Sequence, residues 1–458
     1  MRRFIFVSFA ATIALAPLPL GSNRDWSWSP LATVVGILLL AWASAVIVSP
    51  ARYGEPFIRF KALLVPTALL TIVMAWGLLQ LSGWTPIEWK SPISAETVLG
   101  LHLPSRPSVA FDREQAWIGV MRLLTYIGVF VLAASLPAST SDARRLLGII
   151  VCAAVVYTLY AMVADVTKRM APGTGITIWT PHWLFFTGPF LNANNYATYT
   201  GVAALTALTL AGRSLVAAGF RESTSQRWRR RIGALSGSTG LWLAAALILV
   251  MGVLLSGSRA GWVSLAIAVV AMVALFTRGI GRLVYVLLAV VSFAVLAIVL
   301  PAGRNLVVRM ARLIAEGEAG REWLFPTTLN AISLRPILGW GMNSFESLYS
   351  VFQPAFDSGF YDKAHNTYLE LAFDLGVPGA VLLVLAVVWV SVRCLYGFFK
   401  RTRDRELAVL GFLAGILVGV HALFDFSLQI PAMACTYFAI LGVAWSQSWS
   451  SRQERSYP

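Results

Sequence analysis

Long apolar runs separated by short polar segments make up most of this sequence of 458 residues. Runs of about 18 or more apolar residues are typical of helices that cross a membrane. The pattern predicts an all-α polytopic membrane protein with about 12 transmembrane helices. We expect these spans at about residues 4–20, 31–48, 62–81, 116–136, 146–165, 195–211, 241–255, 261–276, 283–300, 375–396, 407–424 and 428–445.

The longest polar interruption, residues 301–374, lies between the ninth and tenth predicted spans. It contains His365, within a run Ala-His-Asn-Thr-Tyr-Leu-Glu that ends at Glu370. The same loop carries five arginines: Arg304, Arg309, Arg312, Arg321 and Arg335. A histidine and several guanidinium groups beside the mouth of a membrane helix indicate chemistry on an anionic substrate. We therefore expect the rest of the chain to act as the scaffold that presents this loop.

Composition supports the membrane assignment. The chain is 58% hydrophobic and 12% charged, with a mean hydropathy of +0.72, whereas soluble domains are about a quarter charged. In a soluble protein the net charge of +15 would point to nucleic acid. Here the basic residues fall mainly between spans, so membrane orientation is the better explanation, and we expect no nucleic-acid partner.

The distribution of basic residues predicts the orientation. With twelve spans both termini share one side, whose loops hold 22 Lys and Arg, against 14 on the other side. Six of those 14 lie in the loop 301–374, which is too long for the positive-inside rule to count. We expect cytoplasmic termini and a periplasmic or exterior His365 loop. The first apolar run precedes a possible cleavage site at Ala14–Ala16, but Pro17 favours an uncleaved span.

Arg259 follows a tight turn between the seventh and eighth predicted spans. A helix N-terminus offers unpaired N–H groups and a partial positive charge, and Ser256 or Ser258 can cap it. With a guanidinium added, such a turn is suited to phosphate. An arginine that snorkels to the membrane interface is an equally good interpretation of this turn alone.

The remaining arginines of interest are less distinctive. Residues 305–316 have the spacing of an amphipathic helix on the membrane surface, where Arg309 and Arg312 would contact lipid headgroups. Arg321, in Gly-Arg-Glu-Trp, is harder to explain in that way. Arg122 lies within the fourth predicted span and needs a partner, for which Asp165 and Asp425 are candidates.

His365 has a structural explanation too, as a loop histidine that caps a helix. Histidine is nevertheless the usual general base near neutral pH, and Asn366 or Glu370 can orient or polarise it. His421 and Asp425 are four residues apart and share a helix face if the helix continues, most simply as a structural pair. Three amides at the start of the sixth predicted span suit either sugar hydroxyls or helix caps: Asn192, Asn194 and Asn195.

Five motifs together resemble the O-antigen ligase and polymerase superfamily. They are Phe-Leu-Asn-Ala-Asn-Asn-Tyr-Ala at 190–197, Ser-Gly-Ser-Arg-Ala-Gly-Trp at 256–262, Gly-Trp-Gly at 339–341, His-Asn-Thr-Tyr-Leu at 365–369 and Gly-Val-Pro-Gly at 376–379. The resemblance covers residues 190–431. Residues 1–189 match only as a generic series of spans, and 432–458 form the last span and a tail.

The resemblance implies a GT-C-type glycosyltransferase of the bacterial inner membrane with one large periplasmic loop. Its donor is a glycan linked to undecaprenyl diphosphate, and its acceptor is a glycan or lipid A-core. By resemblance, Arg259 and Arg321 fall where family arginines hold the donor diphosphate, and His365 falls on the loop histidine. The chemistry is consistent: the arginines stabilise charge on the leaving diphosphate, and His365 accepts the acceptor's proton, so inversion is expected.

The outer loops contain no glycine-rich nucleotide loop and no Asp-x-Asp motif. The three cysteines, in separate apolar runs, show neither disulfide nor metal-ligand spacing. We therefore expect no nucleotide-sugar donor, no cofactor and no metal, and only membrane lipids as further partners. An O-antigen ligase-like enzyme is the preferred interpretation, a repeat-unit polymerase for O-antigen or exopolysaccharide the closest alternative. A transporter also has many spans and buried charges, but its site lies near the bilayer midplane.

Overall fold

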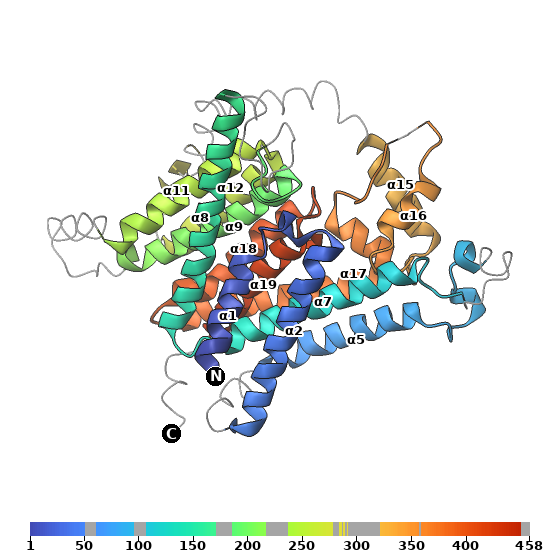
Figure 1. Cartoon of the computed structure of the whole chain (residues 1–458), viewed down its shortest axis with the longest axis horizontal. Helices are drawn as coiled ribbons and strands as arrows, with labels where there is room; N and C mark the ends of the chain where they lie inside the picture. The colour runs from blue at the N-terminus through green and yellow to red at the C-terminus, as the bar shows by residue number, and fades with distance from the viewer. Residues whose placement is uncertain are drawn as a thin grey trace.

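The computed structural model describes residues 1–50, 61–95, 107–170, 186–216, 237–277, 284–285, 287–288, 291, 321–356 and 359–449. The regular elements in these ranges are all helices (Figure 1). The longer ones are α1 (Arg2–Leu15), α2 (Asp25–Val48), α5 (Leu64–Leu81), α7 (Arg113–Ser135), α8 (Thr140–Met170), α9 (Ala193–Val216), α11 (Ser238–Ser256), α12 (Arg259–Phe276), α15 (Arg321–Leu334), α16 (Phe345–Phe352), α17 (Thr367–Lys400), α18 (Arg405–His421) and α19 (Pro431–Ser446). Single 3₁₀ turns are η1 (Leu20–Ser22), η2 (Lys61–Leu63), η3 (Ile87–Trp89) and η4 (Ser427–Gln429).

Seven described helices are long and apolar enough to cross a membrane: α2, α5 with η2, α7, the part Thr140–Val166 of α8, α11, α12 and α17. They establish a multi-pass membrane protein. Helices also occupy the positions predicted for spans in α1, α9, α18 and α19. The ninth predicted span, 283–300, lies largely outside the described residues, as do 305–316, so the total of twelve stays a prediction.

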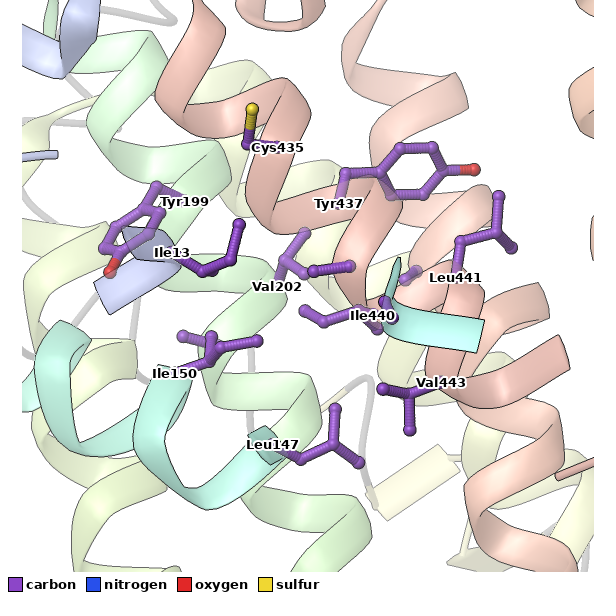
Figure 2. Packing of buried hydrophobic residues seen from close by; sticks show 14 of the residues in the cluster. Ile13, Leu147, Ile150, Tyr199, Val202, Cys435, Tyr437, Ile440, Leu441 and Val443 are labelled. Carbon is purple, nitrogen blue, oxygen red and sulfur yellow. The ribbon is translucent and has the colours of Figure 1, made fainter. Parts of the chain in front are cut away.

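α19, an apolar helix of 16 residues that is shorter than the candidate spans, lies in the middle of the bundle. α19 is buried along almost its whole length and packs against α7, α17 and α18. Figure 2 shows this core, where side chains of α1, α8 and α9 gather around α19: Ile13, Leu147, Ile150, Val202, Ile440 and Val443. α1, α18 and α19 have 14, 17 and 16 residues, so their length alone leaves them out of the candidate spans.

The segments expected on the cytoplasmic side meet at one end of the bundle. Long-range contacts of three arginines hold them: Arg2 donates to the carbonyls of Ser135 and Leu136 (both 3.1 Å), Arg144 pairs with Asp404 (2.8 Å) and Glu406, and Arg401 donates to the carbonyls of Gln447 (2.9 Å) and Trp449 (3.0 Å). The segments expected on one side of the membrane therefore lie together, and the assignment of this end to the cytoplasm stays a prediction.

α17 begins at Thr367, eight residues before the predicted span at 375. The reason is a break at Gly376, whose φ of 74° interrupts the helix and separates its first turns from the long apolar part. The turn after α15 packs into this break: Val377 N–H donates to the Pro336 carbonyl (2.7 Å) and Trp340 N–H to that of Phe373 (2.9 Å). α15 and α16 are thereby fastened over the start of α17 (Figure 1).

The glycines of two sequence motifs make this junction possible. Gly339 has a φ of 67°, and a Cβ there would collide with the backbone of Asp374 and Gly376. A Cβ on Gly376 would collide with the carbonyl of Ile337. Both positions need the left-handed backbone and the close approach that glycine alone permits without strain. Gly339 and Gly376 therefore allow the turn after α15 to pack against α17, the helix that begins two residues after His365.

Candidate active site

His365 lies just before α17, with a φ of 50°. Few residues other than glycine adopt this left-handed conformation, and where it occurs the surroundings usually enforce it. Here Asn366 caps α17 by accepting from the N–H groups of Tyr368 (3.0 Å) and Leu369 (3.1 Å). Thr367 N–H donates to the Ala422 carbonyl (2.9 Å), which ties the start of α17 to the end of α18.

Glu370 supports the other side of the same loop. Its carboxylate, 2% exposed, accepts from Ala364 N–H (3.0 Å) and lies 3.5 Å from the Lys363 ammonium. The side-chain amide of Asn366 donates to the Leu423 carbonyl (3.0 Å). The two side chains expected to orient the imidazole of His365 thus have other partners, and they act on the backbone that carries it.

The side chain that faces His365 is Asp425, in the turn after α18. The distance from His365 Nδ1 to Asp425 Oδ1 is 3.7 Å, and the carboxylate is fully buried. Asn194 at the start of α9 donates to the same oxygen (3.3 Å), and Ser427 donates to Oδ2 (2.7 Å). Three helix ends that are far apart in the chain therefore meet at one carboxylate.

The surroundings of Asp425 keep it ionised. Burial alone would raise its pKa, but the nearby imidazoles of His365 and His421 and the hydrogen bond from Ser427 outweigh that effect. The pKa of the Asp425 carboxyl consequently lies below its ordinary value. An ionised Asp425 favours the proton of His365 on Nδ1, so that Nε2 carries the lone pair.

His421 extends this network into the bundle. It is fully buried, its Nδ1 is 3.9 Å from Asp425 Oδ2 and 3.0 Å from Thr198 Oγ1 on α9. Thr198 in turn lies 2.8 Å from Ser427 Oγ. The expected proximity of His421 and Asp425 is confirmed, but the two do not share a helix face, because α18 ends at His421 and the following turn brings Asp425 back to it.

One of the three amides of the 190–197 motif caps a helix and the other two bond to side chains at Asp425 and Ser427, so a contact with sugar hydroxyls stays a prediction. Asn192 accepts from Asn194 N–H (2.7 Å) and so caps the start of α9. Asn194 bonds Asp425, and Asn195 Oδ1 accepts from Ser427 (3.1 Å). Thr198 and Ser427 were not foreseen from the sequence, since hydroxyls on apolar helices are common. The position of Ser427, two residues after Asp425, is the only signal that pointed to it.

Arg259 opens α12 at the same end of the bundle. Ser258 is the N-cap, accepting from Gly261 N–H (3.1 Å), as one of the two expected serines. Gly261 packs so closely against Ala197 of α9 that an added Cβ would lie 2.6 Å from the Ala197 Cβ. The half-buried Arg259 lies two residues before Gly261, which contacts α9, the helix that carries Thr198. Arg321 is the first residue of α15, and its side chain is outside the described part.

Two other arginines lie against aromatic rings. Arg335 is 8% exposed, lies 5.0 Å from the Trp340 ring and donates to the carbonyls of Val109 (3.3 Å) and Trp89. Burial lowers its pKa to about 10, which still leaves it charged. Arg122 lies 5.2 Å from the Trp28 ring and, among the described residues, has no ion pair with either expected partner. Arg304, Arg309 and Arg312 lie outside the described residues.

Comparisons with known proteins agree with the family resemblance. Residues 244–384 match the model of a family described as O-Antigen ligase, and this segment contains Arg259, Arg321 and His365. The chain is also 28% identical over 120 residues to the exopolysaccharide production protein ExoQ of Rhizobium meliloti (strain 1021). That alignment covers 24% of this chain and 27% of the relative, so it spans only about a quarter of either protein.

Proposed function

We propose that this chain transfers a glycan from an undecaprenyl-diphosphate-linked donor to an acceptor hydroxyl at the periplasmic face of the bacterial inner membrane. The family match over residues 244–384 supports action on a lipid-linked glycan. The single observation that carries the assignment of chemistry is the position of His365 Nδ1, 3.7 Å from the buried carboxyl group of Asp425. Asp425 orients the imidazole, and Nε2 is the nitrogen that accepts the proton.

The reaction is a single displacement. The acceptor oxygen forms a bond to the anomeric carbon while the bond from that carbon to the diphosphate oxygen breaks. The acceptor proton passes to His365 Nε2, and the diphosphate leaves with its lipid. Arg259 and Arg321 stabilise the charge that grows on the leaving group. Displacement from the opposite face inverts the anomeric carbon, and no metal ion is required.

The ligase-like and polymerase interpretations differ only in the acceptor. The similarity to an exopolysaccharide production protein favours keeping a repeat-unit polymerase as the second candidate. Deleting the gene and analysing surface glycans separates the two. Loss of lipid-attached polymer with free polymer retained identifies a ligase, and accumulation of single repeat units identifies a polymerase. Unchanged surface polysaccharide would contradict both.

A further inference from the structure

The end of α17 that lies away from His365 carries an arginine held between two aromatic rings. Arg393 Cζ lies 4.3 Å from the centre of the Trp449 ring and 4.8 Å from that of the Tyr396 ring. Lys400 Nζ lies 5.3 Å from the centre of the same Tyr396 ring. The two cations and the two rings therefore form one stack, which joins the end of α17 to the segment after α19.

This stack contains two buried hydrogen-bond donors without partners. Arg393 Nη1 and Trp449 Nε1 are both shielded from solvent, and neither has a hydrogen-bond partner in the part of the chain that the structure describes. Stacking alone does not have this effect, because Arg335 lies against the Trp340 ring and still donates to two carbonyls. Buried polar atoms in proteins are nearly always hydrogen-bonded, so two exceptions in one stack indicate that another molecule supplies the acceptors.

The stack also has an unbalanced positive charge. Neither Arg393 nor Lys400 forms an ion pair with a described residue. The acidic residues that follow α17 in the chain, Asp404 and Glu406, are both engaged by Arg144. The missing acceptors should therefore carry negative charge, and a guanidinium beside an ammonium is suited to phosphate.

The position of the stack along α17 is that of a lipid headgroup. The part of α17 from Gly376 to Lys400 spans about 36 Å, whereas the hydrocarbon core of a bilayer is about 30 Å thick. Leu385 and Trp389 precede Arg393 at intervals of four residues, which places all three on one helix face, and they are 49% and 48% exposed. This face is apolar along its length and cationic at its end, which matches the two parts of a phospholipid.

We infer that this stack is a binding site for an anionic phospholipid. Its phosphate accepts from Arg393 Nη1 and Trp449 Nε1 and pairs with Lys400, and its acyl chains lie along the apolar face of α17. As whole residues Arg393 and Trp449 are only partly buried, so a small rotation of either side chain brings its donor to the surface. The leaflet expected at this end is the cytoplasmic one, whose surface is anionic. The site is at the other end of α17 from His365, and the inference does not depend on the proposed function.

Native mass spectrometry of the full chain in detergent tests the inference without relying on glycan transfer. Phosphatidylglycerol is compared with phosphatidylcholine, which has the same chains and a phosphate but no net charge. Arg393→Gln and Lys400→Gln each remove one cation of the stack. Arg145→Gln is the matched control, because it removes one positive charge beside Arg144 at the same end of the bundle.

We expect the wild type and Arg145→Gln to bind phosphatidylglycerol roughly 10-fold more tightly than phosphatidylcholine, or better. Arg393→Gln should lose roughly 10-fold in affinity for phosphatidylglycerol, and Lys400→Gln about 5-fold. Lys400 is exposed, so this second variant keeps the test valid if Arg393→Gln does not fold. Equal affinity of the wild type for the two lipids would overturn the inference, as would an equal affinity for phosphatidylglycerol in Lys400→Gln and Arg145→Gln.

Thermal unfolding in detergent distinguishes a lipid from free phosphate. Phosphatidylglycerol should raise the unfolding temperature of the wild type, because a ligand that binds only the folded protein stabilises it. The shift should be smaller in Lys400→Gln and unchanged in Arg145→Gln. Inorganic phosphate at the same concentration should leave the unfolding temperature as it is. No shift with phosphatidylglycerol, or an equal shift with inorganic phosphate, would overturn the assignment of a lipid to this stack.

Discussion

His365 and Asp425 face each other where the start of α17 meets the turn after α18, with Nδ1 and Oδ1 3.7 Å apart. The separation is long for a hydrogen bond, but catalytic contacts often shorten only when substrate binds. The carboxylate is fixed by Asn194 and Ser427, and the histidine backbone by the cap of α17. The Asp425 carboxylate cannot turn away without breaking its contacts with Asn194 and Ser427.

Asp425→Asn should reduce turnover while leaving the protein folded. An amide can still bond Asn194 and Ser427, but it has no charge to stabilise the imidazolium that forms during transfer. We expect kcat to fall about 10²-fold with little change in KM for donor. Steady-state kinetics of the purified variant provide the measurement. Asp142→Asn at the opposite end of the bundle, where Asp142 pairs with Arg145, is the control and should keep normal turnover. Normal turnover in Asp425→Asn would remove Asp425 from the mechanism.

The lowered pKa of Asp425 also predicts a pH dependence of stability. A carboxyl whose pKa is lower in the folded state stabilises the fold above its unfolded pKa of about 3.9. That contribution is lost as the pH falls through the folded-state value. The wild type should therefore unfold at a higher temperature than Asp425→Asn at pH 6, and the difference should shrink steadily below about pH 4. Thermal unfolding in detergent over this range is the measurement, and a difference independent of pH would contradict an ionised Asp425.

Arg259 and Arg321 should not be replaceable by lysine. A guanidinium grips phosphate with two parallel bonds, whereas an ammonium is a point charge. Loss of one such contact should cost about 2 to 4 kcal/mol of transition-state stabilisation, or roughly 30- to 900-fold in kcat/KM. Kinetics of Arg259→Lys and Arg321→Lys, compared with Arg145→Lys at the opposite end, test the prediction. Full activity at normal protein levels would argue against diphosphate binding by these residues.

Reporter fusions test the orientation on which the active-site side depends. The distribution of basic residues predicts a cytoplasmic location for the end of the bundle that holds Arg2, Arg144 and Arg401. Fusions after Arg230 and after Arg403 should report cytoplasm, and a fusion within 356–361 should report periplasm. A reversed pattern would place His365 on the cytoplasmic side and remove the lipid-linked donor from its reach.

The sequence was most informative where local rules decide the structure. Apolar runs located the helices, Ser258 was one of two expected caps, and the spacing of His421 and Asp425 predicted a real pair. It was least informative where distant segments meet. Nothing local indicates that Asn194 bonds Asp425, because the contact depends on the packing of α9 against α18. The sequence predicted too late a start for α17, because the residues before Gly376 are not uniformly apolar. These residues nevertheless form the part of the helix that precedes the break at Gly376.

The identity of the general base is the central claim, and His365→Asn tests it most directly. Asparagine tolerates the left-handed backbone at φ 50°, so the loop should keep its shape while losing the basic nitrogen. Insertion and donor binding should be normal, and glycan transfer should fall by about 10² to 10⁴-fold. If His365→Asn retained near-normal turnover with unchanged donor binding, His365 would be a positioning residue and the proton acceptor would have to be another group.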